Sequence, residues 1–250
     1  PQTMGESQRR LEQGPSVSSA STMSSYPKLV PAFLLHRRCF RDHKFLTYFL
    51  TAEGIIHSIS YRRSKKTSTA LLQPFAPLYI AFKSKKNLPT ISHLELRGPH
   101  HQWLGQKIYV ALYLNEIIFK LGSLYQYDPQ AFDLYEQTLT DLKQFQPPFD
   151  ALLRYFEIKL IEYIGFGLPL AEFASRKTCA MKYYHYDSQE GFVAGPAAPD
   201  RIHEQSLAEM ARFDFHRQET RRQSKQLLQQ IISSLLDHKT IYSKGLWKRN

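Results

Sequence analysis

The chain has 250 residues, of which 42% are hydrophobic and 13% aromatic, and its formal net charge is +11. This length allows one large domain or two to three smaller ones, each with a substantial core. We find no apolar run near the roughly 18 residues that span a bilayer, and no apolar core of a secretory signal near the first residues. We therefore expect a soluble, cytoplasmic protein.

The two cysteines, Cys39 and Cys179, lie far apart and form no CxxC spacing. This excludes a four-cysteine zinc site and argues against a disulfide framework. The histidines His100 and His101 are adjacent rather than spaced as metal ligands are. We therefore expect neither a metal nor another cofactor.

The positive charge is concentrated in one segment. Residues 26–98 hold 13 basic and 3 acidic residues, a net charge of +10, whereas residues 1–25 sum to zero, 99–178 to −2 and 179–250 to +3. This asymmetry predicts a basic module that meets a polyanion, joined to a near-neutral module with another task. Nucleic acid is the first candidate for the polyanion.

Residues 1–25 are rich in Ser, Gln and Gly and almost without apolar side chains, so they are predicted to be disordered. Short apolar and β-branched runs of strand length follow, separated by turn residues. These predicted strands are 29–36, 45–50, 55–61, 76–82 and 88–94. Such a succession fits a small Greek-key barrel, of which the OB-fold is a common case, and a five-stranded SH3-like barrel would give the same pattern.

From residue 99 onward the periodicity is helical. An almost uniformly apolar run at 106–121 predicts a buried helix, Asp128-Pro129 has the form of a helix start, and a third helix is expected to end at Gly165–Gly167. Residues 181–194 are typical of a β-hairpin, and a last amphipathic helix is predicted at about 219–236. The expected fold class is α+β, with a basic barrel at 26–98 and a helical domain at 99–250 that carries the hairpin.

The densest positive charge lies in the loop Tyr61–Lys66. Lys and Arg at phosphate spacing gain affinity for nucleic acid by releasing counterions, without reading sequence. Phe40, Tyr48 and Tyr61 lie among these cations and are expected to stack on unpaired bases, although solvated charges and core aromatics would give the same pattern. The expected phosphate contacts are Arg37, Arg38, Arg62, Arg63, Lys65 and Lys66, followed by Arg41, Lys44, Lys85 and Lys86.

Sequence signatures of catalysis do not occur: there is no GxxxxGK[ST], GxGxxG, GxSxG or HExxH. Asp187 and Glu190 are predicted to form a turn. Arginines flank Cys39 and favour its thiolate, but without an evident base we expect a small buried or half-buried residue. We therefore expect a protein that is not an enzyme.

Four segments of the chain, taken in order, resemble four segments of one protein family. Residues 32–38 have the sequence AFLLHRR, 70–78 ALLQPFAPL, 113–117 YLNEI, and 153–157 LRYFE with GFGL at 165–168. They resemble, in this order, the opening strand, the LQPFTPL signature, the YLNEL helix and the LRRFE…LGYGL segment of RecO, a family of bacterial recombination mediators in DNA repair. The basic residues 61–66 fall where that family has its Lys- and Arg-rich stretch.

The resemblance implies a non-catalytic, nucleoid-associated protein. RecO-like proteins bind single- and double-stranded DNA, anneal complementary strands, and work with RecR to load RecA onto strands coated by single-stranded DNA-binding protein. They contact this coating protein through its acidic C-terminal tail, which ends in Phe. The match to LRRFE implies that Arg154 binds this tail; alternatively, Arg154 pairs with Glu157 or Asp150 on the helix surface.

Two departures from the family's pattern matter. Some members carry four cysteines after the helical bundle, whereas that region has Cys179 alone, so zinc is not implied. Tyr155 replaces the second Arg of LRRFE, a change expected to weaken binding of an acidic peptide.

Two other classes of function remain open: an RNA-binding OB-fold module of translation or ribosome assembly, and an enzyme such as a nuclease with a site assembled from distant carboxylates.

Overall fold

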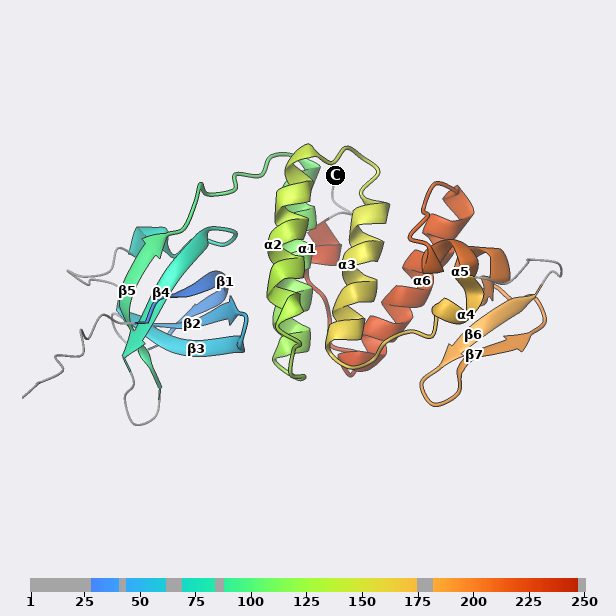
Figure 1. The fold of residues 1–250 in the computed structure, drawn as a ribbon, viewed down its shortest axis with the longest axis horizontal. Coiled ribbons are helices and arrows are strands. Elements are labelled where there is room, and N and C mark those ends of the chain that lie inside the picture. Colours follow the sequence, from blue (N-terminus) through green and yellow to red (C-terminus); the bar gives the residue numbers. More distant parts are fainter. Residues whose placement is uncertain (1–27, 41–43, 62–68, 84–87, 175–181, 247–250) are drawn as a thin grey trace, which may run out of the picture.

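The computed structural model describes residues 28–40, 44–61, 69–83, 88–174 and 182–246. A β-barrel is followed by helices, with a small sheet at the far end of the molecule (Figure 1). The predicted α+β fold class is confirmed. Residues 1–25, predicted to be disordered, and residue 181, at the start of the predicted hairpin, lie outside the described ranges.

The N-terminal unit is a closed barrel with the strand order β1-β2-β3-β5-β4. Neighbouring strands are antiparallel except for β3 and β5, which are parallel. This is the partly Greek-key arrangement of an OB-type barrel, as the strand pattern predicts. The strands are β1 (Val30–Cys39), β2 (Lys44–Thr51), β3 (Gly54–Tyr61), β4 (Pro77–Lys83) and β5 (Thr90–Leu96), with a 3-10 turn at Thr69–Leu71 before β4.

Alternation along the strands divides the barrel's apolar side chains between two cores. Leu34 and Phe49 point into the barrel, where they pack with Leu78 and Ile80. Side chains on the outer face, such as Phe33, instead join the core of the helices. Part of the outer face of the barrel therefore packs against the helical part of the chain.

Polar contacts fix this junction. The buried Asn115 donates through Nδ2 to the carbonyl of Leu35 (2.6 Å) and accepts from the hydroxyl of Tyr135 (2.8 Å), so one side chain joins a strand to two helices. Arg97, at the exit of the barrel, forms an ion pair with Glu136. Because Asn115 and Tyr135 are buried, loss of either partner would leave an unsatisfied polar group.

Three helices follow the barrel: α1 (Gln106–Gly122), α2 (Gln130–Gln144) and α3 (Asp150–Tyr163). Their apolar positions recur at helical spacing and form one core, as predicted. Asp128 accepts from the backbone N–H of Gln130 (2.8 Å), so the Asp-Pro start is present, although α2 begins one residue after Pro129. The last amphipathic helix is α6 (Gln218–Leu235), which packs against α3.

The far end of the molecule holds a three-stranded sheet of order β7-β6-β8. Strands β6 (Tyr183–Asp187) and β7 (Gly191–Gly195) form the predicted hairpin, and Asp187 accepts from the N–H groups of Gln189 (2.7 Å) and Glu190 (2.9 Å), as expected of a turn residue. Four short elements were not predicted: α4 (Ala171–Ala174), β8 (Ile202–His203), α5 (Glu204–Ala211) and α7 (Ser243–Leu246).

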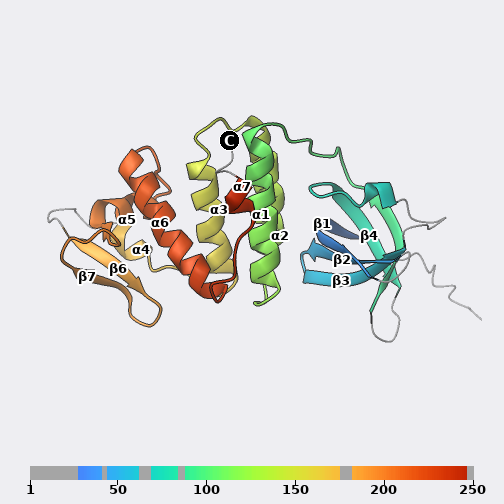
Figure 2. The same ribbon diagram turned by 180° about the vertical axis from the view of Figure 1, so that it is seen from behind.

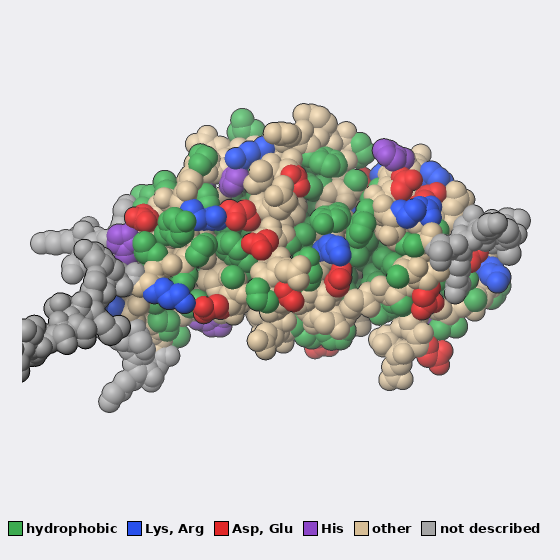
Figure 3. Space-filling view, viewed as in Figure 1, with side chains coloured by type: hydrophobic (Ala, Val, Ile, Leu, Met, Phe, Trp, Pro, Cys, Tyr) green, Lys and Arg blue, Asp and Glu red, His purple; other side chains and the backbone are tan. Residues whose placement is uncertain are grey.

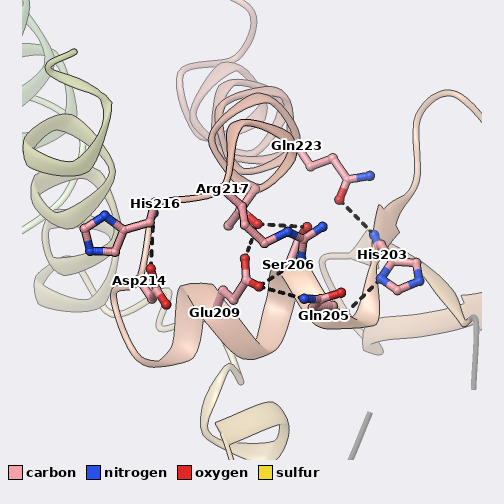
Figure 4. Close-up of polar contacts among 9 residues, drawn as sticks. His203, Gln205, Ser206, Glu209, Asp214, His216, Arg217 and Gln223 are labelled. Atoms are coloured by element: carbon pink, nitrogen blue, oxygen red, sulfur yellow. Dashed lines mark hydrogen bonds and ion pairs between the residues drawn. The ribbon is translucent and has the colours of Figure 1, made fainter. Parts of the chain in front are cut away.

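Helix α5 is short, and side-chain hydrogen bonds and an ion pair stabilise it. His203 caps its start by accepting from the N–H of Gln205 (3.1 Å). The buried carboxylate of Glu209 accepts from Gln205 (3.0 Å) and from Arg217 (2.8 Å), which lies just before α6 (Figure 4). This network joins α5 to α6 through polar side chains. The apolar pattern of α5 gives no sign of it.

Candidate nucleic-acid interface and an apolar cavity lined by cations

Three segments that carry predicted phosphate contacts join the barrel at neighbouring strand ends; two of them are basic, and in the third, residues 41–43, Arg41 stands beside Asp42. Residues 41–43 link β1 to β2, residues 62–68 follow β3, and residues 84–87 lie between β4 and β5. The strand residues that flank them pair with one another, as Cys39–Phe45, Lys44–Tyr61, Thr90–Ile59 and Thr90–Lys83. The register of the sheet therefore gathers the attachment points of all three segments in one part of the barrel.

Most of the predicted phosphate contacts belong to these segments and lie outside the described residues. They are Arg41, Arg62, Arg63, Lys65, Lys66, Lys85 and Lys86. Their contact with phosphate stays a prediction from the sequence.

The other three predicted contacts are described. Arg37 is exposed, donates to the carbonyl of Leu72 (3.2 Å), and lies 5.5 Å from the centre of the Phe45 ring. Arg38 is also exposed and, as the next residue of β1, points to the opposite face of the strand. The Nζ of Lys44 lies 5.4 Å from the centre of the Tyr61 ring. Such cation–π contacts orient a side chain and leave its charge available to phosphate.

An aromatic cluster lies where the barrel meets α1. His36, Tyr48 and His57 come from three adjacent strands, paired as His36–Tyr48 and Tyr48–His57. Phe119 of α1 completes the cluster, with its ring centre 5.2 Å from that of His36 and 5.1 Å from that of Tyr48. The sequence indicated Tyr48 as a stacking residue but not the other three.

A β-bulge explains why His36 was missed. The pairing of β1 with β2 shifts between Leu34 and His36, so Leu35 is an extra residue and His36 faces outward with Tyr48. Strict alternation would place His36 on the same side as Leu34, inside the barrel. The expectation for Cys39 was wrong: this residue is exposed, because it ends β1 beyond the part of the strand that packs against the helices.

The helical part contains a cavity of about 450 Å³ between α1, α3, α6 and α7. Figure 2 shows α7 beside α1 and α3 on this side of the molecule. Apolar side chains form much of its wall, namely those of Tyr113, Phe149 and Leu153. The charged and polar part of the wall consists of three cations, one carboxylate and one amide, namely Arg154, Lys225, Lys244, Asp150 and Gln229, so cations outnumber carboxylates there. An apolar cavity with a few convergent charges is the usual form of a binding site for a small ligand or peptide end.

Arg154 forms a buried ion pair with Glu157, one of the two partners considered from the sequence. The guanidinium Nε lies 2.7 Å from Oε2 and Nη2 donates to Oε1 (2.8 Å), and neither residue lies on the helix surface. Tyr113 also donates to the Glu157 carboxylate. Burial and, next, the nearby Glu157 charge raise the pKa of the Tyr113 hydroxyl well above its ordinary value, so it remains a hydrogen-bond donor.

The two lysines are the cations that a ligand in the cavity meets most directly. Lys225 is exposed on α6, and Lys244 lies half-buried on α7. Burial is the main reason that the pKa of Lys244 is below its ordinary value, with Glu157 opposing this effect. The sequence showed both residues as basic, but it gave no sign that they meet Arg154, because they are far from it along the chain.

The face drawn in Figure 3 has a different character. Hydrophobic side chains gather over the region between α3 and α6, and elsewhere on this face the coloured cations and carboxylates are interspersed. The exposed aromatic residues of the helical part include Tyr155 and Phe213, whose ring centres lie 5.0 Å apart. Among the described residues on this face, the cations are therefore not concentrated as a polyanion site requires.

Two further findings concern the part of the chain that the structure describes. Within it, none of the helices combines the length and the apolar character needed to cross a bilayer. Within the same residues, no three His, Cys, Asp or Glu side chains gather as metal ligands would.

Comparison with known proteins agrees with this architecture. Residues 105–243 match the family described as "Recombination protein O C terminal". The chain is 34% identical over 175 residues to the DNA repair protein RecO of Tolumonas auensis, covering 67% of this chain and 72% of that protein. It is 31% identical over 227 residues to the RecO protein of Cellvibrio japonicus, covering 88% and 96% of the two chains. The chain therefore belongs to the RecO family.

Proposed function

We propose that this chain acts in DNA repair and homologous recombination as a mediator that binds single- and double-stranded DNA and anneals complementary strands. The observation that carries the proposal is that three segments with predicted phosphate contacts, two of them strongly basic, are attached at neighbouring strand ends of an OB-type barrel. Annealing requires that the phosphate charge of two strands be neutralised together, and it requires no nucleophile.

The proposed DNA contacts combine described and undescribed residues. Arg37, Arg38 and Lys44 lie on the strands beside the attachment points of the basic segments. The remaining contacts are expected in the segments themselves, at Arg41, Arg62, Arg63, Lys65, Lys66, Lys85 and Lys86. Because these contacts are to phosphate, we expect binding that depends strongly on salt and weakly on base sequence.

The cavity of the helical part is the proposed site for the acidic tail of single-stranded DNA-binding protein. Its apolar wall suits the terminal Phe side chain, and Lys225 and Lys244 suit the carboxylates. Arg154 is proposed to contribute from the wall, where its pairing with Glu157 fixes the shape of the site. RecR and, through it, RecA are the further partners that the resemblance implies.

Annealing of two complementary labelled oligonucleotides at low salt tests the DNA-handling part of the proposal. We expect annealing well above the spontaneous rate, and inhibition by added salt. The absence of acceleration at low salt would contradict the proposal. A preference for structured RNA in competition would instead support an RNA-binding module, and magnesium-dependent cleavage of the strands would indicate a nuclease.

A further inference from the structure

We propose that unpaired DNA bases stack on the aromatic cluster of His36, Tyr48, His57 and Phe119, and that the strand continues from there onto the helical part. This inference rests on the proposed DNA binding and adds to it a defined site for single strands. It also assigns α1 and the segment between α6 and α7 a direct role in holding DNA.

The four rings form a continuous surface rather than isolated contacts. The ring centre of Tyr48 lies 4.6 Å from that of His57 and 5.7 Å from that of His36, and Phe119 stacks on His36 with an angle of 27° between the rings. His36 and His57 are exposed, and Tyr48 and Phe119 are half-buried. Phe119 packs against the helical core on one side but, unlike the fully buried Phe33, keeps part of its surface accessible.

The cluster occupies one row of an ordered outer face on β1–β3. The row nearest the helices, Phe33, Leu50 and Ile55, belongs to the apolar core. The aromatic row follows, and beyond it Arg38 pairs with Leu46 and Lys44 pairs with Tyr61, next to the basic segments. A strand held by its phosphates at the basic end can therefore lay its bases on the aromatic row.

Phe119 also lines a second cavity, of about 430 Å³, which extends the surface onto the helical part. Leu124 and Tyr242 line this cavity and are exposed, at 48% and 76% of their surfaces. Lys239 is an exposed cation on the same wall. In Figure 2 the chain rises from the end of α6 to α7 alongside α1. Because Phe119 lines this cavity and also contacts His36 and Tyr48, it joins the cavity to the aromatic cluster of the barrel.

Lys120 connects two walls of the second cavity, α1 and the segment between α6 and α7. Its Nζ forms an ion pair with Glu116 (2.8 Å), donates to the carbonyl of Thr240, and lies 4.7 Å from the centre of the Tyr242 ring. Glu116 in turn accepts from the backbone N–H groups of Tyr242 (2.8 Å) and Ser243 (2.7 Å). The carboxylate is thus neutralised by cation and backbone donors, and the positive charge of Lys239 is left to a phosphate.

The chemistry of this surface selects single strands. Aromatic rings bind the faces of unpaired bases by stacking. In a duplex the base faces are covered by neighbouring base pairs, so they are not available to the rings. Stacking on aromatic side chains is also tolerant of sequence, because every base has such a face. This suits a protein proposed to receive strands of any sequence before they pair.

Equilibrium binding by fluorescence anisotropy tests the proposal with three ligands: a labelled oligo-dT, an oligonucleotide of equal length made of abasic residues, and a duplex. The test variants are Tyr48→Leu with Phe119→Leu, and separately His57→Ser and Tyr242→Ser. Tyr155→Leu with Phe213→Leu is the matched control, because it removes two exposed rings that belong to another part of the surface.

We expect the test variants to lose about fivefold or more in affinity for oligo-dT for each ring removed, while affinity for the abasic strand and for duplex stays within twofold of wild type. The control is expected to bind all three ligands as wild type does. Should Tyr48→Leu with Phe119→Leu unfold, the exposed His57 and Tyr242 variants still carry the test.

Oligo-dT affinity within twofold of wild type in all folded test variants would overturn the stacking site, and so would an equal loss on the abasic strand. Both results leave the proposed DNA binding intact, because wild type would still bind. Failure of the wild-type protein to bind any of the three ligands at low salt would instead remove the proposed function itself.

Discussion

Arg154 and Glu157 form an ion pair within α3 that is almost completely withdrawn from solvent, with side-chain exposures of 3% and 0%. Their charged groups approach to 2.7 Å and 2.8 Å, and the Tyr113 hydroxyl donates to the same carboxylate. Because the cost of burying two charges is offset only when both are present, each residue depends on the other. Arg154 also lines the cavity that we propose for the acidic tail, so this residue serves both the fold and the proposed peptide site.

Replacing Arg154 with Ala should therefore lower the free energy of unfolding by about 3–5 kcal/mol, because Glu157 would stay buried without its partner. The double variant Arg154→Met with Glu157→Gln removes both charges and should lose far less. Urea denaturation of the two variants and wild type measures this difference. Equal losses in the single and double variants would contradict the account of a mutually dependent pair.

Removal of the two cavity lysines should weaken binding of an acidic, Phe-ending peptide while the fold is retained. For Lys225→Gln with Lys244→Gln we expect a loss of about tenfold or more, since charge-assisted hydrogen bonds contribute about 1.5–3 kcal/mol each. Isothermal titration with the peptide measures the loss, and Lys182→Gln, an exposed lysine outside the cavity, serves as control. Unchanged peptide affinity would place the tail elsewhere.

The lowered pKa of Lys244 predicts how the peptide affinity depends on pH. A carboxylate binds the protonated lysine, so affinity is constant below the pKa of Lys244 and falls as pH rises through it. Because burial lowers this pKa below the ordinary 10.5, the fall should begin at lower pH than for an exposed lysine. Titrations at increasing pH measure the midpoint of the fall. In Lys244→Gln this midpoint should move upward, and an identical profile would contradict the role of Lys244.

Reversal of four charges in residues 62–66, which follow β3 in the sequence, should weaken DNA binding strongly. With Arg62, Arg63, Lys65 and Lys66 all changed to Glu, the dependence of log affinity on log salt should flatten by about 0.7 for each single-strand phosphate that the variant no longer neutralises. Binding at several salt concentrations gives this slope. A matched variant with Lys107, Lys143, Lys159 and Lys182 changed to Glu should keep the wild-type slope. Equal slopes for both variants would mean that the DNA site lies outside the loop.

The larger elements of the fold were predictable because each is encoded by a local pattern. Five strand-length runs gave β1–β5, and the helical spacing of apolar residues gave α1, α2, α3 and α6. The hairpin followed from the turn residue Asp187. In each of these cases a few consecutive residues carry both the propensity and the burial pattern.

The short elements and the sites depend on residues that are distant in sequence. Helix α5 is only 8 residues long, too short for a convincing period, and it is held by the ion pair of Glu209 with Arg217. The cavity proposed for the acidic tail combines Tyr113, Arg154 and Lys244 from three helices. The aromatic cluster needed the bulge at Leu35, which changes the side of the barrel that His36 faces. Tertiary packing determines helix α5, the cavity and the aromatic cluster, and local sequence patterns do not predict such packing.

A mediator that handles DNA and binds the acidic tail of the coating protein should anneal coated strands, and one experiment measures both properties. Two complementary labelled oligonucleotides are coated with single-stranded DNA-binding protein, either intact or without its acidic tail. Their pairing is then followed after the 250-residue RecO-family protein is added. We expect rapid annealing with the intact coating protein and a marked loss of the annealing rate without the tail. Equal annealing rates with both coating proteins, or no annealing with either at low salt, would contradict it.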